Sequence, residues 1–131
     1  MTLIPAKHTF TIWSGATFFE VLTLYETNDN TTPRDFCSTS GSTRTVVYTA
    51  EKIIREKPQG SPLFTLSSAN GRIIFPTEIE NIGQIRLLIS DTDTAGLPFN
   101  SGVYDLTITK TDETPHITEA LLYGGIKVAG V

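Results

Sequence analysis

Short runs of alternating polar and apolar residues recur along the whole chain, and turn residues separate them. The runs at 8–13, 84–89 and 103–109 show this pattern most clearly. Side chains on a β-strand point alternately to the two faces of a sheet, so a period of two predicts strands with one buried face. About eight such strands at short spacing predict an all-β sandwich or barrel rather than alternating helices and strands.

Composition agrees with this fold class. Threonine accounts for 21 of the 131 residues, and its branched Cβ suits a pleated, half-buried surface. Hydrophobic residues make up 39% of the chain, which is ordinary for a protein with one packed core. We therefore expect a single domain over residues 1–131, with a short N-terminal arm at 1–7.

The connections between the runs can also be predicted. The stretch 27–42 is rich in Asn, Thr, Ser and Gly and is expected to be a long loop. Asn70–Gly71 is a strong hairpin dipeptide and is expected to join strands at 63–66 and 73–75. The stretch 48–57 contains helix formers, but its alternation favours a strand. As a strand, it would place Lys52 in the middle of a face that also carries Val46, Tyr48, Ala50 and Ile54.

Charge and hydropathy exclude several classes of protein. The net charge is −4, which argues against a protein that binds nucleic acid, because such proteins normally carry a basic patch. No run approaches the roughly 18 apolar residues of a membrane-spanning helix, so no membrane association is expected. The first residues do not resemble a signal peptide. The single cysteine, Cys37, cannot form a disulfide within the chain.

No pattern of residues indicates catalysis or a cofactor. His8 and His116 accompany no recognisable nucleophile motif, and Cys37 has little nearby that would lower its pKa. Carboxylates two positions apart occur at Asp91 and Asp93, but the spacing of a calcium loop is absent. We therefore expect no enzymatic activity, no metal site and no cofactor.

The aromatic residues allow two interpretations. Trp13 falls on the strand face opposite Phe10 and Ile12, so it is exposed or covered by another subunit. We favour an interface, because Trp and Tyr often anchor protein contacts. A sugar-stacking platform is the alternative, and the residues that could build one are Trp13, Tyr25, Tyr48, Tyr104 and Tyr123.

Five stretches, taken in order, carry a resemblance to a known group of proteins. They are Phe10–Phe18; Pro33–Phe36 with Tyr48–Ala50 and Ile54–Arg55; Gly83–Ser90 leading into Asp93–Pro98; Gly102–Ile108; and Leu121–Val128. Together they resemble the small immunoglobulin-like structural proteins of tailed bacteriophages, found at the tail tip, baseplate or collar. Two features depart from that pattern: Lys52 stands where the group usually has an apolar residue, and 34–46 is longer and more polar than expected.

The resemblance implies an immunoglobulin-like antiparallel sandwich of about seven to nine strands, with a short helical turn near residues 91–96. This turn would form a structural corner between the two sheets, made by Asp93, Thr94, Ala95 and Tyr104. Asp93 is expected to cap the helical turn. The ring of Tyr104 is expected in the core, with its hydroxyl bonded to backbone just upstream.

The resemblance also implies a function. The chain would be a structural virion protein, a repeated subunit of a ring that links the tail tube or hub to fibres, assembled in the cytoplasm of the bacterial host. Its partners would be further copies of itself and other tail proteins. The residues expected at such contacts are Leu3, Ile4, Trp13, Arg34 and Phe36. The alternative is a carbohydrate-binding module for attachment to the host surface.

Overall fold

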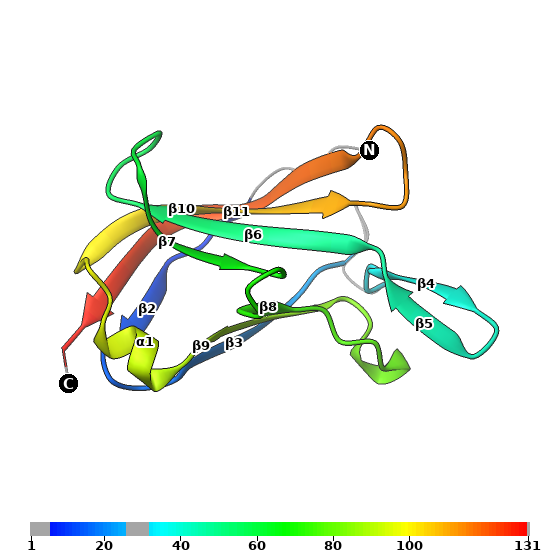
Figure 1. Ribbon diagram of the computed structural model, residues 1–131, viewed down its shortest axis with the longest axis horizontal. Helices are drawn as coiled ribbons and strands as arrows, with labels where there is room; N and C mark the ends of the chain where they lie inside the picture. The colour runs from blue at the N-terminus through cyan, green and yellow to red at the C-terminus, as the bar shows by residue number, and fades with distance from the viewer. Residues whose placement is uncertain (1–5, 26–31, 131) are drawn as a thin grey trace.

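Two packed β-sheets form the body of the protein in the computed structural model, which describes residues 6–25 and 32–130 (Figure 1). The larger sheet has the order β1-β11-β10-β6-β7, and β2 also pairs with β11. Its strands are β1 (Ala6–Lys7), β2 (Phe10–Trp13), β6 (Tyr48–Arg55), β7 (Pro62–Ser67), β10 (Ser101–Lys110) and β11 (Ile117–Ala129). The smaller sheet has the order β3-β9-β8, with β3 (Phe18–Thr23), β8 (Ile73–Ile74) and β9 (Gln84–Ile89).

The expected immunoglobulin-like sandwich is confirmed by this arrangement. The pairing β7-β6-β10-β11 on one layer and β3-β9-β8 on the other follows the distribution of strands in such sandwiches. The helical turn expected near 91–96 is α1 (Asp91–Ala95), which connects β9 in one sheet to β10 in the other. The N-terminal edge departs from a purely antiparallel sandwich, because β1 and β2 both pair parallel to β11.

Alternating burial along the strands creates the core between the sheets. In β6 the side chains of Tyr48, Ala50, Lys52 and Ile54 are buried and their neighbours are more exposed, so the strand interpretation of this stretch is correct. Leu106 and Ile108 of β10 face the same interior. Each fully buried aliphatic side chain contributes roughly 1.5–3 kcal/mol of hydrophobic stabilisation, so burial of these side chains is a large favourable contribution to folding.

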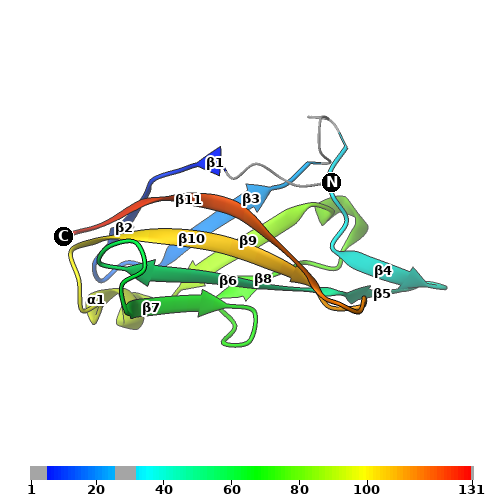
Figure 2. The same cartoon turned by 90° about the horizontal axis from the view of Figure 1, so that it is seen from above.

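The prediction of a long loop over 27–42 is wrong in its second half. Cys37–Ser40 forms β4, which pairs with β5 (Thr43–Val46) in a separate hairpin. Gly41 adopts a φ of 63° in the turn between them, a conformation that suits glycine. Both views show this hairpin projecting beyond the end of the sandwich (Figures 1 and 2). Because Ser38, Thr39 and Ser40 are all exposed, β4 has no apolar face that could reveal it in the sequence.

The predicted hairpin at Asn70–Gly71 is also wrong. The turn exists, but β7 pairs with β6 and β8 pairs with β9, so the chain passes here from one sheet to the other. The Asn70 side chain holds the turn, because its Oδ1 accepts hydrogen bonds from the backbone N–H groups of Ser67 (3.0 Å) and Arg72 (3.1 Å). The dipeptide therefore marks a turn without specifying which strand pairs with which. A single turn of 3₁₀ helix (Ile79–Asn81) precedes β9.

Candidate contact face and binding groove

The outer surface of the smaller sheet carries exposed apolar side chains. Phe19 and Val21 of β3 are 58% and 42% exposed, and Ile74 of β8 is 40% exposed. Leu88 of β9 lies directly opposite Phe19 in the strand register. Arg86 stands between Val21 and Ile74 as the cross-strand neighbour of both. Phe19, Val21, Ile74 and Leu88 are called the apolar face below, and this surface suits contact with another protein.

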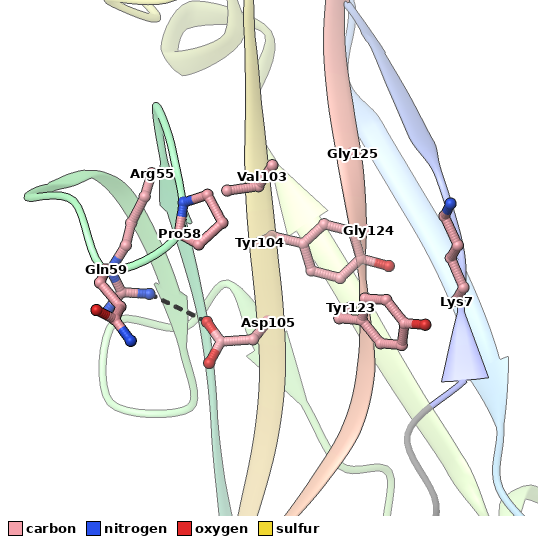
Figure 3. A pocket seen from close by; sticks show the side chains of 10 residues that line it. All are labelled: Lys7, Arg55, Pro58, Gln59, Val103, Tyr104, Asp105, Tyr123, Gly124 and Gly125. Carbon is pink, nitrogen blue, oxygen red and sulfur yellow. Dashed lines mark hydrogen bonds and ion pairs between the residues drawn. The ribbon is translucent and has the colours of Figure 1, made fainter.

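A groove on the outer side of the larger sheet is the second candidate site, with a cavity volume of about 700 Å³ (Figure 3). Gly124 and Gly125 of β11 line the floor of the groove, where their lack of side chains leaves the backbone open. Tyr123 stands beside them and is 48% exposed. The other lining residues are Lys7, Arg55, Pro58, Gln59, Val103, Tyr104 and Asp105. A half-exposed tyrosine ring beside charged and amide groups can bind a ligand that has both an apolar face and hydroxyl groups.

An ion pair and a glycine shape this groove. Arg55 of β6 and Asp105 of the neighbouring strand β10 form an ion pair, with 3.1 Å between Nη1 and Oδ1 (Figure 3). This side of the groove therefore carries one positive and one negative group. On the opposite side, the backbone of His8 approaches Gly124 so closely that a Cβ there would overlap the carbonyl oxygen of His8. Glycine is therefore required at position 124 for the edge strand to lie against β11.

Lys52 is buried in the core in an aromatic cage. Its side chain is 1% exposed, and Nζ lies 3.4 Å from the ring centroid of Phe10, 4.4 Å from that of Tyr104 and 5.7 Å from that of Phe18. Burial lowers the pKa of Lys52 to about 7, and the negative charge of Glu20 opposes this shift. Because the amine is enclosed, it cannot reach a substrate in solution, and its role is in the core.

Tyr104 occupies the expected place in the core but makes a different hydrogen bond. Its ring is 4% exposed, and its hydroxyl donates to the carbonyl oxygen of His8 at 2.6 Å. The prediction that the hydroxyl bonds backbone just upstream is therefore wrong. His8 lies in the break between β1 and β2, which both pair parallel with β11. At this point the His8 backbone lies close to Gly124, the residue opposite Tyr104 in the strand register, so the His8 carbonyl is within reach of the Tyr104 hydroxyl.

The corner around α1 is held by Ser90, Arg72 and Thr94. The expected cap, Asp93, is wrong: the Ser90 side chain caps the helix by accepting from the N–H of Asp93 at 3.2 Å. Asp93 instead accepts from Arg72 Nη2 at 2.9 Å, which keeps the pKa of its carboxyl below the usual value. The buried Thr94 hydroxyl donates to the Ala16 carbonyl at 2.8 Å. Ser90 precedes the first helical turn by one residue, and this is the position where a capping oxygen reaches free N–H groups.

The residues expected at contacts with other chains occupy different environments. Leu3 and Ile4 lie outside the described residues. Trp13 is 55% exposed at the end of β2 and is open to a partner. Phe36 is 3% exposed and packs in the core against Tyr48 and Phe75.

Arg34 is occupied within the chain. Its Nη2 and Nη1 lie 2.6 Å and 3.2 Å from the carboxylate oxygens of Glu119, and its Nη2 also donates to the Tyr48 hydroxyl at 3.0 Å. The hydrogen bonds that Arg34 donates to Glu119 raise the pKa of Arg34 above its already high value. This bidentate pair ties the segment before β4 to the start of β11.

The groups that could serve catalysis or bind metals are scattered. His8 Nε2 lies 3.6 Å from Glu20 Oε1, His116 is exposed, and burial raises the pKa of Cys37. Within residues 6–25 and 32–130, no group of three or more His, Cys, Asp and Glu side chains could hold a metal ion. Over the same ranges, no helix is long and apolar enough to cross a membrane.

No protein-family model matches the chain, and no curated protein matches it.

Proposed function

We propose that this protein is a non-enzymatic structural subunit of a bacteriophage tail, at the tail tip, baseplate or collar. The proposal joins two lines of support: the resemblance of five ordered sequence stretches to small tail proteins, and the apolar face on the smaller sheet. The chain would act by binding neighbouring proteins through fixed surfaces and would be present in several copies around the tail axis. One contact surface is then reused at each position of the ring.

The apolar face is the observation that carries the proposal. Phe19 is more than half exposed although it lies within a regular strand, and Val21 and Ile74 extend the same surface. Covering a side chain of this kind stabilises a complex by roughly 25 cal/mol for each Å² of apolar surface removed from water. A rigid sheet presents these side chains without a loss of backbone entropy on binding. The face therefore suits a partner protein in a lasting assembly.

The proposal is tested by measuring molar mass with light scattering, for the chain alone and mixed with each candidate tail protein. We expect a defined complex with at least one tail component. Ile74→Ser, on the apolar face, should weaken this complex, and Tyr123→Ser, on the other sheet, should leave it intact. A chain that joins no tail component, or a complex that loses nothing with Ile74→Ser, would contradict the proposed role of the face.

Carbohydrate binding is a second candidate function, supported by the groove beside Tyr123. Its exposed ring lies near the Arg55–Asp105 ion pair and Gln59, and a ring with adjacent hydrogen-bonding groups is suited to a sugar. Screening the isolated protein against host-surface glycans tests this function. Binding that is lost with Tyr123→Ser and kept with Ile74→Ser would support it, and a lack of binding to every glycan would argue against it.

A further inference from the structure

Strand β3 forms an edge of the smaller sheet, and its outward backbone groups can be assigned. Leu24 N–H donates to the Gly83 carbonyl at 2.8 Å, and Leu88 N–H donates away from β3, to the Arg72 carbonyl at 2.8 Å. Because successive residues of a strand direct their N–H and C=O groups to opposite sides, these bonds fix the direction of every residue in β3. The even-numbered residues bond β9, and the groups that point away from the sheet belong to Phe19, Val21 and Thr23.

Most of the features that usually protect an exposed edge strand are absent from β3. Natural edge strands carry proline, lysine, a bulge, very short length or an inward-pointing charge. Over its six residues β3 has no proline, lysine or bulge, and its register with β9 is regular. Its one charged residue, Glu20, points between the sheets toward His8 and leaves the outward face of the strand uncharged. The outward side chains are Phe19, Val21 and Thr23, which have high β-propensity and are exposed.

We propose that β3 pairs antiparallel with β3 of a second copy of this chain, around a twofold axis that passes Val21. Val21 then faces Val21 of the second copy, and Phe19 faces Thr23. This register uses the outward N–H and C=O groups of all three residues. It deepens the proposed function by naming one partner as another copy, and it rests on that function for its place in a tail.

Charge disfavours the neighbouring register with its axis at Glu20. A twofold axis at Glu20 would place the carboxylates of the two copies directly opposite each other, and like charges at such positions destabilise a sheet. With the axis at Val21, each Glu20 lies beside Leu22 of the other copy. The two β3-β9-β8 sheets become one continuous sheet, and the two apolar faces join across the axis. A tail component would then meet a surface twice as large as that of one chain.

The wild-type protein provides the first test, because the pairing protects specific amides. We expect light scattering to give twice the 14.3 kDa of one chain as concentration rises. In hydrogen exchange measured by NMR, the amides of Phe19, Val21 and Thr23 should become protected over the same concentrations. The amides of Glu20 and Leu22 bond β9 and should be protected throughout. A mass of one chain at every concentration, or a dimer in which the first three amides exchange freely, would overturn the proposal.

Two variants make the test independent of exchange data. Val21→Lys places two like charges at the axis and should abolish the dimer, while Ile74→Lys, on the same face but in β8 at the opposite edge of the sheet, should keep it. If Val21→Lys does not fold, Val21→Cys in a Cys37→Ser background should form a disulfide between copies on oxidation, because directly opposite Cα atoms lie about 5.5 Å apart. Ile74→Cys in the same background should not. Absence of that crosslink in a folded Val21→Cys protein would contradict the pairing.

The outcomes separate this inference from the proposed function. A dimer with protected β3 amides that binds no tail component would retain the pairing and remove the tail function. A protein that stays monomeric and binds a tail component would retain the tail function and remove the pairing.

Discussion

The ammonium nitrogen of Lys52 lies 3.4 Å from the centroid of the Phe10 ring, inside a core made of aliphatic and aromatic side chains. Two effects act on it in opposite directions. Burial disfavours the charged amine and lowers its pKa to about 7, whereas the electron-rich ring faces favour the cation. The fold therefore carries an amine whose charge state in the folded protein changes close to neutral pH.

This arrangement predicts that stability rises with pH. The pKa of Lys52 is about 7 in the folded chain and 10.5 in the unfolded chain. Between these values the unfolded chain binds more protons, so the free energy of unfolding increases with pH, by at most about 1.4 kcal/mol per pH unit. Below pH 7 Lys52 is charged in both the folded and the unfolded chain, so the free energy of unfolding gains nothing from this group there. Urea denaturation at a series of pH values measures the slope.

Replacing Lys52 tests the origin of that slope. Lys52→Met should remove most of the pH dependence over this range and raise the free energy of unfolding near pH 7 by roughly 1–3 kcal/mol, because no amine is then desolvated. Lys127→Met, at an exposed position on β11, serves as the control and should leave the slope unchanged. An equal slope in wild type and Lys52→Met would show that other groups cause it.

The Arg34–Glu119 pair should contribute measurably to stability. Both side chains are largely covered, at 18% and 12% exposure, and the geometry is bidentate. Removing Glu119 leaves a guanidinium without its carboxylate, so Glu119→Ala should lower the free energy of unfolding by about 2–4 kcal/mol. A double-mutant cycle with Arg34→Ala isolates the pair. The more exposed Arg55–Asp105 pair should give a coupling of only about 0.2–1 kcal/mol, and equal couplings would contradict this difference.

The buried hydroxyl of Thr94 should be needed to hold the turn between β2 and β3 against α1. It donates to the Ala16 carbonyl and accepts from the Gly15 N–H at 3.1 Å. Thr94→Val keeps the shape of the side chain but leaves both backbone groups without this hydrogen-bond partner. We expect the free energy of unfolding, measured by chemical denaturation, to fall by about 1–3 kcal/mol. Thr92→Val, exposed on the same helix, should change stability by less than about 0.5 kcal/mol.

The hydrogen bond from Tyr104 to His8 predicts a local effect. Tyr104→Phe keeps the ring in the core and removes the 2.6 Å hydrogen bond, and it should lower the free energy of unfolding by about 1 kcal/mol. Because that bond reaches the edge strand, amide exchange should accelerate in β2 more than in β6. Tyr123→Phe removes an exposed hydroxyl and is the matched control. Uniform acceleration across all strands would indicate global destabilisation instead.

Alternation in the sequence was sufficient to predict an all-β sandwich or barrel and most of its inward-facing residues. It placed Tyr48, Lys52 and Ile54 on one face of a strand, although a lysine stood among them, because backbone geometry decides the face. Alternation failed for β4, where no side chain is fully buried and pairing within a hairpin supplies the order. It also failed at Asn70, because turn chemistry is local and does not determine which sheet the next strand joins.

The candidate sites were harder to predict than the fold. Residues 18–22 are apolar except for Glu20, so neither face of this strand stands out as the exposed one in the sequence. Only the packing shows that Phe18 enters the core and Phe19 does not. Phe36 illustrates the converse, since the resemblance implied a contact with another chain but the side chain packs in the core beside Tyr48. The groove at Tyr123 depends on Gly124, which lets the backbone of His8 lie close to β11, and this approach between distant segments is set by the tertiary fold.

Quantitative mass spectrometry of purified tailed particles is the decisive test of the proposed tail function. The particles should come from cells that express this chain in its natural genomic setting. We expect the chain to be a component of the particles, in a fixed ratio of several copies per tail, and to stay bound after extensive washing. Particles that carry a complete tail and none of this chain would show that the protein is not a tail subunit.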